Sequence, residues 1–182
     1  MTAVPELAAA SRAPAPDPPA RAPEGEPPAQ VSPVALPAGV SAVDDDGERH
    51  IGAFDCRECA YAAADTVGSA RTPLPPTIRS ILVPCSGRVS PLHLLAALAG
   101  GADGVYVAGC LEGQCHYRVG NFHALDRMAF VRNLLRSVGV EPERAAMFTM
   151  SAADAPRFVA AARHMDETIR RLPRLRRQEP CR

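Results

Sequence analysis

The sequence predicts a small α/β domain in which helices cover both faces of a parallel sheet. Two observations indicate this fold: after residue 46 short apolar runs alternate with helix-compatible stretches, and Gly or Pro residues separate many of them. The 182 residues are enough for one domain with an additional tail. A chain that alternates in this way is expected to form a three-layer domain of the Rossmann or flavodoxin-like kind.

The expected strands and helices follow one another along the chain. Four apolar runs are typical of strands, at residues 51–54, 78–84, 104–109 and 145–150. Four stretches favour helices, at residues 59–71, 90–100, 121–138 and 151–172. Ser90 followed by Pro91 is typical of a helix start, whereas Gly139 and Pro173 are typical of helix ends.

The helix expected at 121–138 is long and amphipathic. Side chains that recur at helical spacing along it are expected to form one face, namely Phe122, Leu125, Met128, Ala129, Arg132 and Leu135. This helix would then cover part of one sheet face.

Residues 1–46 are expected to form a disordered, acidic tail rich in Pro and Ala. Ten of the 19 Pro residues precede residue 40, and the tail holds seven acidic residues against two Arg. Such a composition offers no continuous apolar face to bury. The tail is either a simple extension, a docking arm or a linker. The folded domain is expected at 47–173, and residues 174–182 form a basic C-terminal tail.

Composition argues against several classes of function. The 20 basic residues are all Arg and equal the 20 acidic residues in number, so the sequence has neither a catalytic lysine nor the positive charge of a nucleic-acid binder. The sequence lacks a secretory signal pattern and any run of about 18 apolar residues that would span a membrane. We therefore expect a cytoplasmic protein that binds neither nucleic acid nor membrane.

Five of the six Cys residues follow the expected strands. Cys56 and Cys59 form a C-x-x-C motif after the first strand, Cys85 follows the second, and Cys110 and Cys115 follow the third. Because the carboxyl ends of parallel strands lie at one edge of a sheet, these five thiols are expected to converge there. Cys181 lies in the basic C-terminal tail and is not expected to be a ligand.

Several thiols at one edge suit a soft or borderline metal. Cytosolic thiols stay reduced, so metal or redox chemistry is a better interpretation than structural disulfides. The spacing matches neither a zinc finger nor a ferredoxin run. Three interpretations follow from the spacing: an iron–sulfur cluster, a zinc site that stabilises an interaction module, or a dithiol–disulfide oxidoreductase that uses Cys56 and Cys59.

The loops beside the thiols offer supporting groups. Ser86 and Gly87 place backbone N–H groups at a strand-to-helix turn, where these groups can donate to sulfur. Arg88 can offset the negative charge of thiolates, and Gly109 lets the backbone approach closely. His116 is expected to be a hydrogen-bond donor behind a ligand, a ligand itself or a residue that caps the site.

From residue 51 to residue 172 the sequence resembles the delta subunit family of methyl-viologen-reducing hydrogenases, also called the hydrogenase iron–sulfur subunit. The resemblance rests on four ordered motifs: CRECAY at 56–61, PCSGRV at 84–89, GADGV at 101–105, and AGC at 108–110 with CHY at 115–117. It covers about two-thirds of the chain and leaves the N-terminal tail outside.

The resemblance implies a small electron-transfer subunit that carries one [2Fe–2S] cluster, with four of the five Cys as ligands. In that family the subunit connects a hydrogenase, or a formate dehydrogenase in its place, to a flavoprotein subunit of the heterodisulfide reductase type. The resemblance therefore implies a subunit without a catalytic site of its own, in an oxidoreductase complex. It leaves open which Cys is not a ligand.

Overall fold

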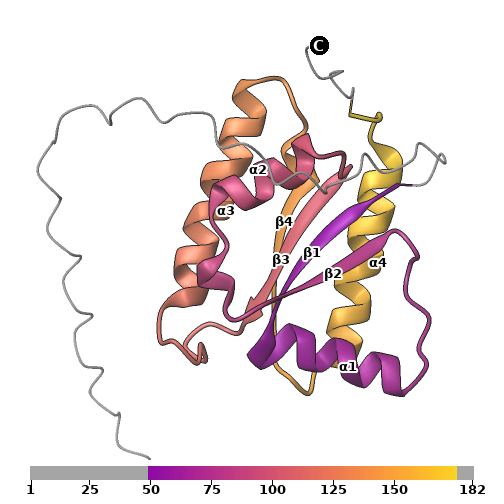
Figure 1. Cartoon of the computed structure of the whole chain (residues 1–182), viewed down its shortest axis with the longest axis vertical. Helices are drawn as coiled ribbons and strands as arrows, with labels where there is room; N and C mark the ends of the chain where they lie inside the picture. The colour runs from indigo at the N-terminus through magenta and orange to yellow at the C-terminus, as the bar shows by residue number, and fades with distance from the viewer. Residues whose placement is uncertain (1–48, 176–182) are drawn as a thin grey trace, which may run out of the picture. The chain divides into compact units, whose positions relative to one another are not determined.

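A computed structural model describes residues 49–175 of the chain (Figure 1). The strands are β1 (Ile51–Cys56), β2 (Ile78–Val83), β3 (Gly104–Cys110) and β4 (Ala145–Met150). The helices are α1 (Ala62–Ser69), α2 (Pro91–Ala99), α3 (Gly120–Ser137) and α4 (Ala155–Arg171). The tail expected at 1–46, the residues 176–182 of the basic segment and Cys181 lie outside the described residues.

The four strands form one parallel sheet in the order β2-β1-β3-β4. Helices α1 and α4 contact each other on one face, and α2 and α3 contact each other on the opposite face (Figure 1). The three-layer parallel α/β fold expected from the sequence is therefore confirmed. Among residues 49–175, no helix combines the length and the apolar composition needed to cross a membrane.

The strand order reverses between β1 and β3. From β1 the chain crosses by α1 to β2 on one side, whereas from β3 it crosses by α3 to β4 on the other side. The two crossover helices diverge here, which leaves a crevice at the carboxyl ends of the two strands. Cys56 ends β1 and Cys110 ends β3, so these two residues meet at this crevice.

The core has one apolar layer on each face of the sheet. Successive residues of β3 point to opposite faces, so Tyr106 and Ala108 pack toward α1 and α4 while Val105 and Val107 pack toward α2 and α3. All seven residues of β3 are buried, as expected for a central parallel strand. Edge strand β2 is more exposed, and its residues Ile81 and Leu82 keep 41% and 44% of their surface accessible.

The helix boundaries differ from the sequence-based expectations at two places. A π-helical turn over Arg57–Tyr61 precedes α1, so helical structure begins at the residue after Cys56 and not at Cys59. Helix α4 begins at Ala155 and not at Ser151, because residues 151–154 form a turn before the helix. The start of α2 is as expected, with the Ser90 backbone N–H donating to Nδ1 of His93 over 3.0 Å.

The face of α3 expected from the sequence is only partly correct. Met128 and Leu135 are buried, but Phe122, Ala129 and Arg132 are exposed. The buried face is completed by small or shorter residues: Gly120, Asn121, Ala124 and Val131. Close contact at the N-terminal end of the helix requires small residues, whereas the expected face was built partly from the bulky Phe122.

The amino ends of the strands are held by a buried polar network. Arg144 is fully buried and donates to the carbonyl oxygen of Asp103 over 2.8 Å, to Glu141 Oε2 over 2.7 Å and to the carbonyl oxygen of Pro173. The Asp103 carboxylate accepts from Arg49 and from the His50 backbone N–H, both over 3.1 Å. This network ties the segment before β1 and the segment after α4 to the same edge.

Candidate metal centre

The five Cys residues predicted to converge do so, at the carboxyl edge of the sheet. All five are buried, belong to the same side-chain cluster and are free of disulfide bonds among the described residues. They form two groups that the sequence did not distinguish. We call Cys56, Cys59 and Cys110 the trio, and Cys85 and Cys115 the pair.

The trio assembles at the crevice between β1 and β3. The Sγ atoms of Cys56, Cys59 and Cys110 all lie within 4.8 Å of one another, and those of Cys56 and Cys110 are 3.9 Å apart. Cys59 joins them because the π-helical turn brings it back toward the end of β1. Three sulfur atoms at this separation are suited to a single soft or borderline cation.

The pair is formed by two loops that are distant in the sequence. The Sγ atoms of Cys85 and Cys115 are 3.9 Å apart. Cys115 is held by a tight turn in which the Arg118 backbone N–H donates to the Cys115 carbonyl oxygen over 2.8 Å, with Arg118 at a positive φ of 68°. Gly113 precedes this turn with a φ of 73°, a conformation that favours glycine.

The loop after β2 connects the trio to the pair. Its Ser86 backbone N–H is directed at the sulfur of Cys56, and its Gly87 backbone N–H donates to the sulfur of Cys85 over 3.4 Å. The Pro84 carbonyl oxygen lies 4.0 Å from the Cys56 Sγ atom. Both sulfur groups therefore contact one short segment.

Two glycines leave the space that the pair needs. A Cβ atom on Gly120 would lie 2.5 Å from the Cys85 Sγ atom and 3.2 Å from that of Cys115. A Cβ atom on Gly87 would lie 2.7 Å from the Gly120 Cα atom. The shortest distance at each glycine is below the closest approach of real Cβ atoms, so the N-terminus of α3 contacts the Cys85 loop backbone to backbone.

Backbone N–H groups stabilise thiolates at both groups. The pKa of Cys56 is lowered to about 5, mainly by a hydrogen bond from the Cys59 thiol. Burial raises this pKa, whereas hydrogen bonds from the backbone N–H groups of Glu58 and Ser86 lower it further. At Cys115 burial raises the pKa, but several hydrogen bonds to the sulfur outweigh it and the pKa lies below its ordinary value. Those bonds come from the N–H groups of Tyr117, Asn121 and Gly120 and from the Cys85 thiol.

The remaining thiols are harder to deprotonate. Burial raises the pKa of Cys85 to about 11 and also raises the pKa of Cys110. The neighbouring Cys56 thiol and burial raise the pKa of Cys59 far above its ordinary value. Negative charges so close together repel one another in a buried site, so a cation is needed before all five sulfurs can be thiolates.

The other residues predicted for the site lie beside these sulfurs, with different contacts. The His116 backbone N–H is directed at the Cys110 sulfur, and its ring packs against Tyr117 with a centroid distance of 5.3 Å. A Cβ atom on Gly109 would lie 2.8 Å from Ser86 Oγ, so this glycine allows the Ser86 turn to approach β3. Arg88 is exposed and lines a hollow that includes Cys85.

Sequence reasoning did not assign a role in the site to Asn121 and Asp55. The Asn121 side-chain amide donates to the carbonyl oxygens of Cys110 and Leu111, over 3.3 and 2.8 Å, and so holds the chain after β3 against α3. Asp55 is buried next to Cys56 and hydrogen-bonds Ser80; burial raises its pKa to about 7. An Asn at the start of the expected helix is a sequence signal that could have indicated this role, whereas the burial of Asn121 is visible only in the structure.

These observations fit a cation-containing thiolate cofactor. The donor set is five sulfurs, backbone N–H groups are directed at four of them, and Gly120 leaves a cradle that a Cβ atom would fill. Thiolates select zinc and iron–sulfur clusters, and hydrogen bonds to sulfur are typical of the latter. Paired carboxylates for general acid–base chemistry are not present beside the described thiols.

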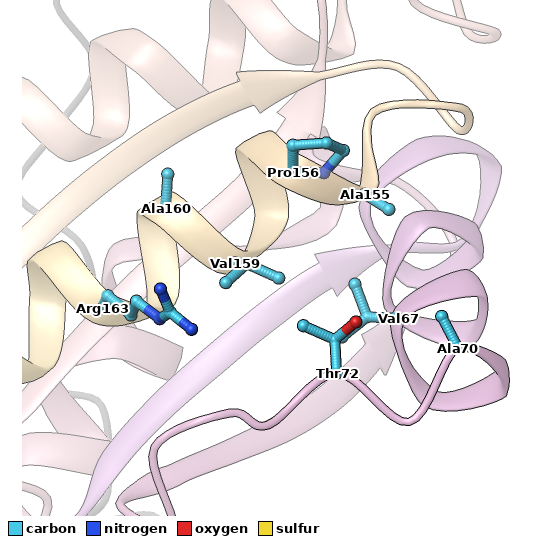
Figure 2. Close-up of a pocket in the computed structure, with 8 residues that line it drawn as sticks. All are labelled: Val67, Ala70, Thr72, Ala155, Pro156, Val159, Ala160 and Arg163. Carbon is cyan, nitrogen blue, oxygen red and sulfur yellow. The ribbon is translucent and has the colours of Figure 1, made fainter.

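The other hollows of the described surface differ in chemistry. One of about 420 Å³ lies between α1 and α4 (Figure 2). Its walls are mainly small apolar side chains, with the Arg163 guanidinium at one end. It contains neither a thiol nor a carboxylate, so it does not compete with the cysteine-rich edge as a metal site.

Comparison with known proteins gives the family. The sequence profile of the family described as "Methyl-viologen-reducing hydrogenase, delta subunit" matches residues 51–173. The iron–sulfur subunit of an F420-non-reducing hydrogenase from Archaeoglobus profundus is 42% identical over 130 residues, which are 71% of this chain and 95% of that protein. The corresponding iron–sulfur subunit of the vhu F420-non-reducing hydrogenase from Methanopyrus kandleri is 43% identical over 125 residues, or 69% of this chain and 95% of that protein.

A second kind of relative is much longer. It is the A chain of the ferredoxin/F(420)H(2)-dependent CoB-CoM heterodisulfide reductase from Methanosarcina acetivorans, which is 46% identical over 108 residues. The match covers 59% of this chain but only 14% of that protein, so the same domain occurs there within a larger polypeptide. With the profile match across the whole folded domain, these similarities show that the chain belongs to the methyl-viologen-reducing hydrogenase delta subunit family.

Proposed function

We propose that this chain is an electron-transfer subunit that carries one [2Fe–2S] cluster on four of its five clustered Cys residues. The observation that carries the proposal is the convergence of five buried thiols from three strand ends, with backbone N–H groups directed at their sulfurs. A bound cluster supplies one-electron chemistry. The chain's own residues hold it, exclude water and set its charge environment.

The two sulfur groups can supply the number of protein ligands that this cluster requires. Each of two irons takes two protein sulfurs, and the pair can supply one iron while the trio supplies the other. The sulfurs of Cys56 and Cys110, like those of Cys85 and Cys115, are 3.9 Å apart, close to the separation expected for two thiolates on one tetrahedral metal. The Cys that is not a ligand therefore belongs to the trio.

The relatives support a role between two redox partners. Some are hydrogenase iron–sulfur subunits of nearly the same length as the matched domain, and others are heterodisulfide reductase chains that contain it. We propose that the chain transfers electrons between a hydrogenase or formate dehydrogenase subunit and a heterodisulfide-reductase-type flavoprotein in the cytoplasm. We assign this transfer to the domain at 47–173.

One observation favours a second candidate, a dithiol–disulfide oxidoreductase. The lowered pKa of Cys56, next to Cys59 in a C-x-x-C motif, is typical of a redox-active thiol. However, Cys56 keeps only 1% of its surface exposed, so a substrate disulfide cannot reach its sulfur in this conformation. The same burial is compatible with a metal ligand.

Anaerobic purification followed by metal and sulfide analysis tests the proposal. We expect a coloured protein with about two irons and two sulfides per chain. Colourless protein with one zinc per chain would contradict it in favour of a zinc-stabilised module. Protein that contains neither metal, and that reduces disulfides in a thiol-dependent assay, would contradict it in favour of the oxidoreductase.

A further inference from the structure

The pair opens to the surface through a hollow of about 450 Å³ that includes Cys85 and Gly87. Its rim carries two large side chains that remain half exposed, Tyr117 at 53% and Val119 at 51%. We call this surface the pair face. It is lined by Arg88, Tyr117, Val119 and His123, and we include the exposed Arg118, which lies between Tyr117 and Val119 in the sequence.

The pair face opens directly onto Cys85, one of the two thiols of the pair. In the pair, Cys115 and Cys85 keep 8% and 4% of their surface exposed; in the trio, the values are 5%, 1% and 2% for Cys110, Cys56 and Cys59. The trio has its own opening, a smaller hollow of about 200 Å³ whose lining includes Cys59, Cys110 and the acidic Glu58. Electron transfer is fastest where the separation of cofactors is smallest, and the hollow beside Cys85 lets a partner approach the pair closely.

Positively charged side chains lie on and beside the pair face. The two segments that form it, residues 84–93 and 113–125, contain Arg88, Arg118 and three His residues, and the exposed acids Glu112 and Asp126 directly flank the second segment. Arg88 and Arg118 are both exposed. A third cation, the partly buried Arg127, is held next to the first segment, where it donates to the carbonyl oxygen of Val89 over 3.2 Å.

We propose that the pair face is the docking surface for a redox protein whose contact surface is acidic around an apolar centre. This inference rests on the proposed electron-transfer function. The half-exposed Tyr117 and Val119 provide the apolar centre, and Arg88 and Arg118 provide the charged rim that orients the partner. Each exchange oxidises one centre and reduces the other by one electron, and no proton or chemical group is transferred.

The absence of lysine gives a direct test. In the Arg118→Lys variant, the new amine keeps the positive charge and is the only side-chain amine of the whole chain. The matched control is Arg132→Lys, at an exposed position of α3 that is about 18 Å along the helix from Gly120. Each full-length, metal-loaded variant is mixed with an acidic plant-type [2Fe–2S] ferredoxin as the probe and treated with a carbodiimide.

We expect Arg118→Lys to form a 1:1 covalent adduct with the ferredoxin in at least tenfold higher yield than Arg132→Lys. Arg88→Lys, on the same face, is expected to behave like Arg118→Lys. Raising the ionic strength from about 0.02 to about 0.5 M should remove most of the adduct, since exposed charges are screened at high salt. Equal yields from Arg118→Lys and Arg132→Lys, or no adduct from any variant, would overturn the proposal.

A second measurement separates this proposal from the proposed function. Iron and sulfide are determined on the same samples before cross-linking. If the protein contains the cluster but Arg118→Lys gives no more adduct than Arg132→Lys, the docking surface is contradicted and the electron-transfer function is not. Protein that lacks a cluster but still forms the Arg118→Lys adduct contradicts the electron-transfer function and leaves the acidic-partner surface supported.

Discussion

The two edges of the parallel sheet have opposite compositions. The carboxyl edge holds five buried thiols, close backbone contacts between glycines, and N–H groups that are directed at sulfur. The amino edge holds buried charges that are already satisfied by other protein groups, with Arg144 at its centre. The carboxyl edge therefore has the donor groups of a metal site, whereas the charged groups of the amino edge are paired with other protein groups. Substitutions at each edge test this division.

The largest effect is expected at the pair. Cys85→Ser and Cys115→Ser should each abolish cluster binding, because either change leaves one iron with a single protein sulfur. In the trio, one of the three single Ser variants should keep the cluster. Iron analysis and visible absorbance after anaerobic purification measure this. Full iron content in Cys85→Ser or Cys115→Ser would show that the pair is not essential.

The amino edge is tested by Arg144→Met, which should lower the free energy of unfolding by about 3 kcal/mol. The guanidinium is fully buried, and its loss leaves the carbonyl oxygens of Asp103 and Pro173 without a donor. Chemical denaturation measures the effect, with Arg132→Met at an exposed position as the control. The folded fraction of Arg144→Met should still bind the cluster; selective loss of iron would contradict the division between the edges.

Gly120→Ala tests the space around the pair. The added Cβ would lie 2.5 Å from the Cys85 Sγ atom, and such overpacking costs about 1–3 kcal/mol. We expect a lower iron content and an altered visible spectrum. The control is Gly68→Ala in α1, where a Cβ would have no atom within 4 Å. Equal iron content and identical spectra in the two variants would show that the contact at Gly120 is not needed.

Arg88→Ala should keep the cluster but lower its reduction potential. A nearby positive charge favours the reduced, more negative form, so its removal disfavours reduction. Arg88 is exposed, and we expect a shift on the order of tens of millivolts, or a few-fold in the equilibrium constant. A spectroscopic redox titration, with Arg132→Ala as the control, measures it. An unchanged reduction potential would show that the charge of Arg88 does not influence the cluster.

The smallest effect is expected for Asp166→Asn in α4. Burial raises the pKa of Asp166, but hydrogen bonds from Arg170 and from Thr77, over 2.8 and 2.6 Å, outweigh it and lower the pKa below its usual value. The wild-type carboxylate therefore stabilises the fold above its unfolded pKa of about 3.9, by about 1 kcal/mol or less.

That stabilisation is lost as the pH falls through the folded pKa of Asp166. The difference in free energy of unfolding between the wild type and Asp166→Asn should thus shrink between about pH 6 and about pH 3. Urea denaturation at a series of pH values measures the difference. A difference that stays constant with pH would show that the carboxylate charge is not involved.

Much of the fold could be predicted because the signals were local. Apolar runs marked the four strands, and Ser90 and Pro91 marked the start of α2. The buried face of α3 was less predictable, because side-chain size misled the assignment. Phe122 is exposed, while Ala124 packs inward, where the close approach of the helix leaves no room for a larger residue.

The carboxyl edge was predictable only in outline. Parallel topology was enough to bring Cys85 and Cys110 to one edge, since both follow strands of the same sheet. The division into trio and pair depends on the π-helical turn before α1 and on the turn in which Arg118 adopts a positive φ. Neither conformation leaves a periodic pattern in the sequence.

The contact between Gly87 and Gly120 has a consequence for how the centre responds to a change of charge. Two backbones that touch with no side chain between them cannot slide past each other without moving a whole helix. The sulfurs of the pair are therefore clamped from both sides. If the pair binds a cluster, this backbone contact would oppose movement of its ligands when an electron arrives, and small ligand movements favour fast electron exchange.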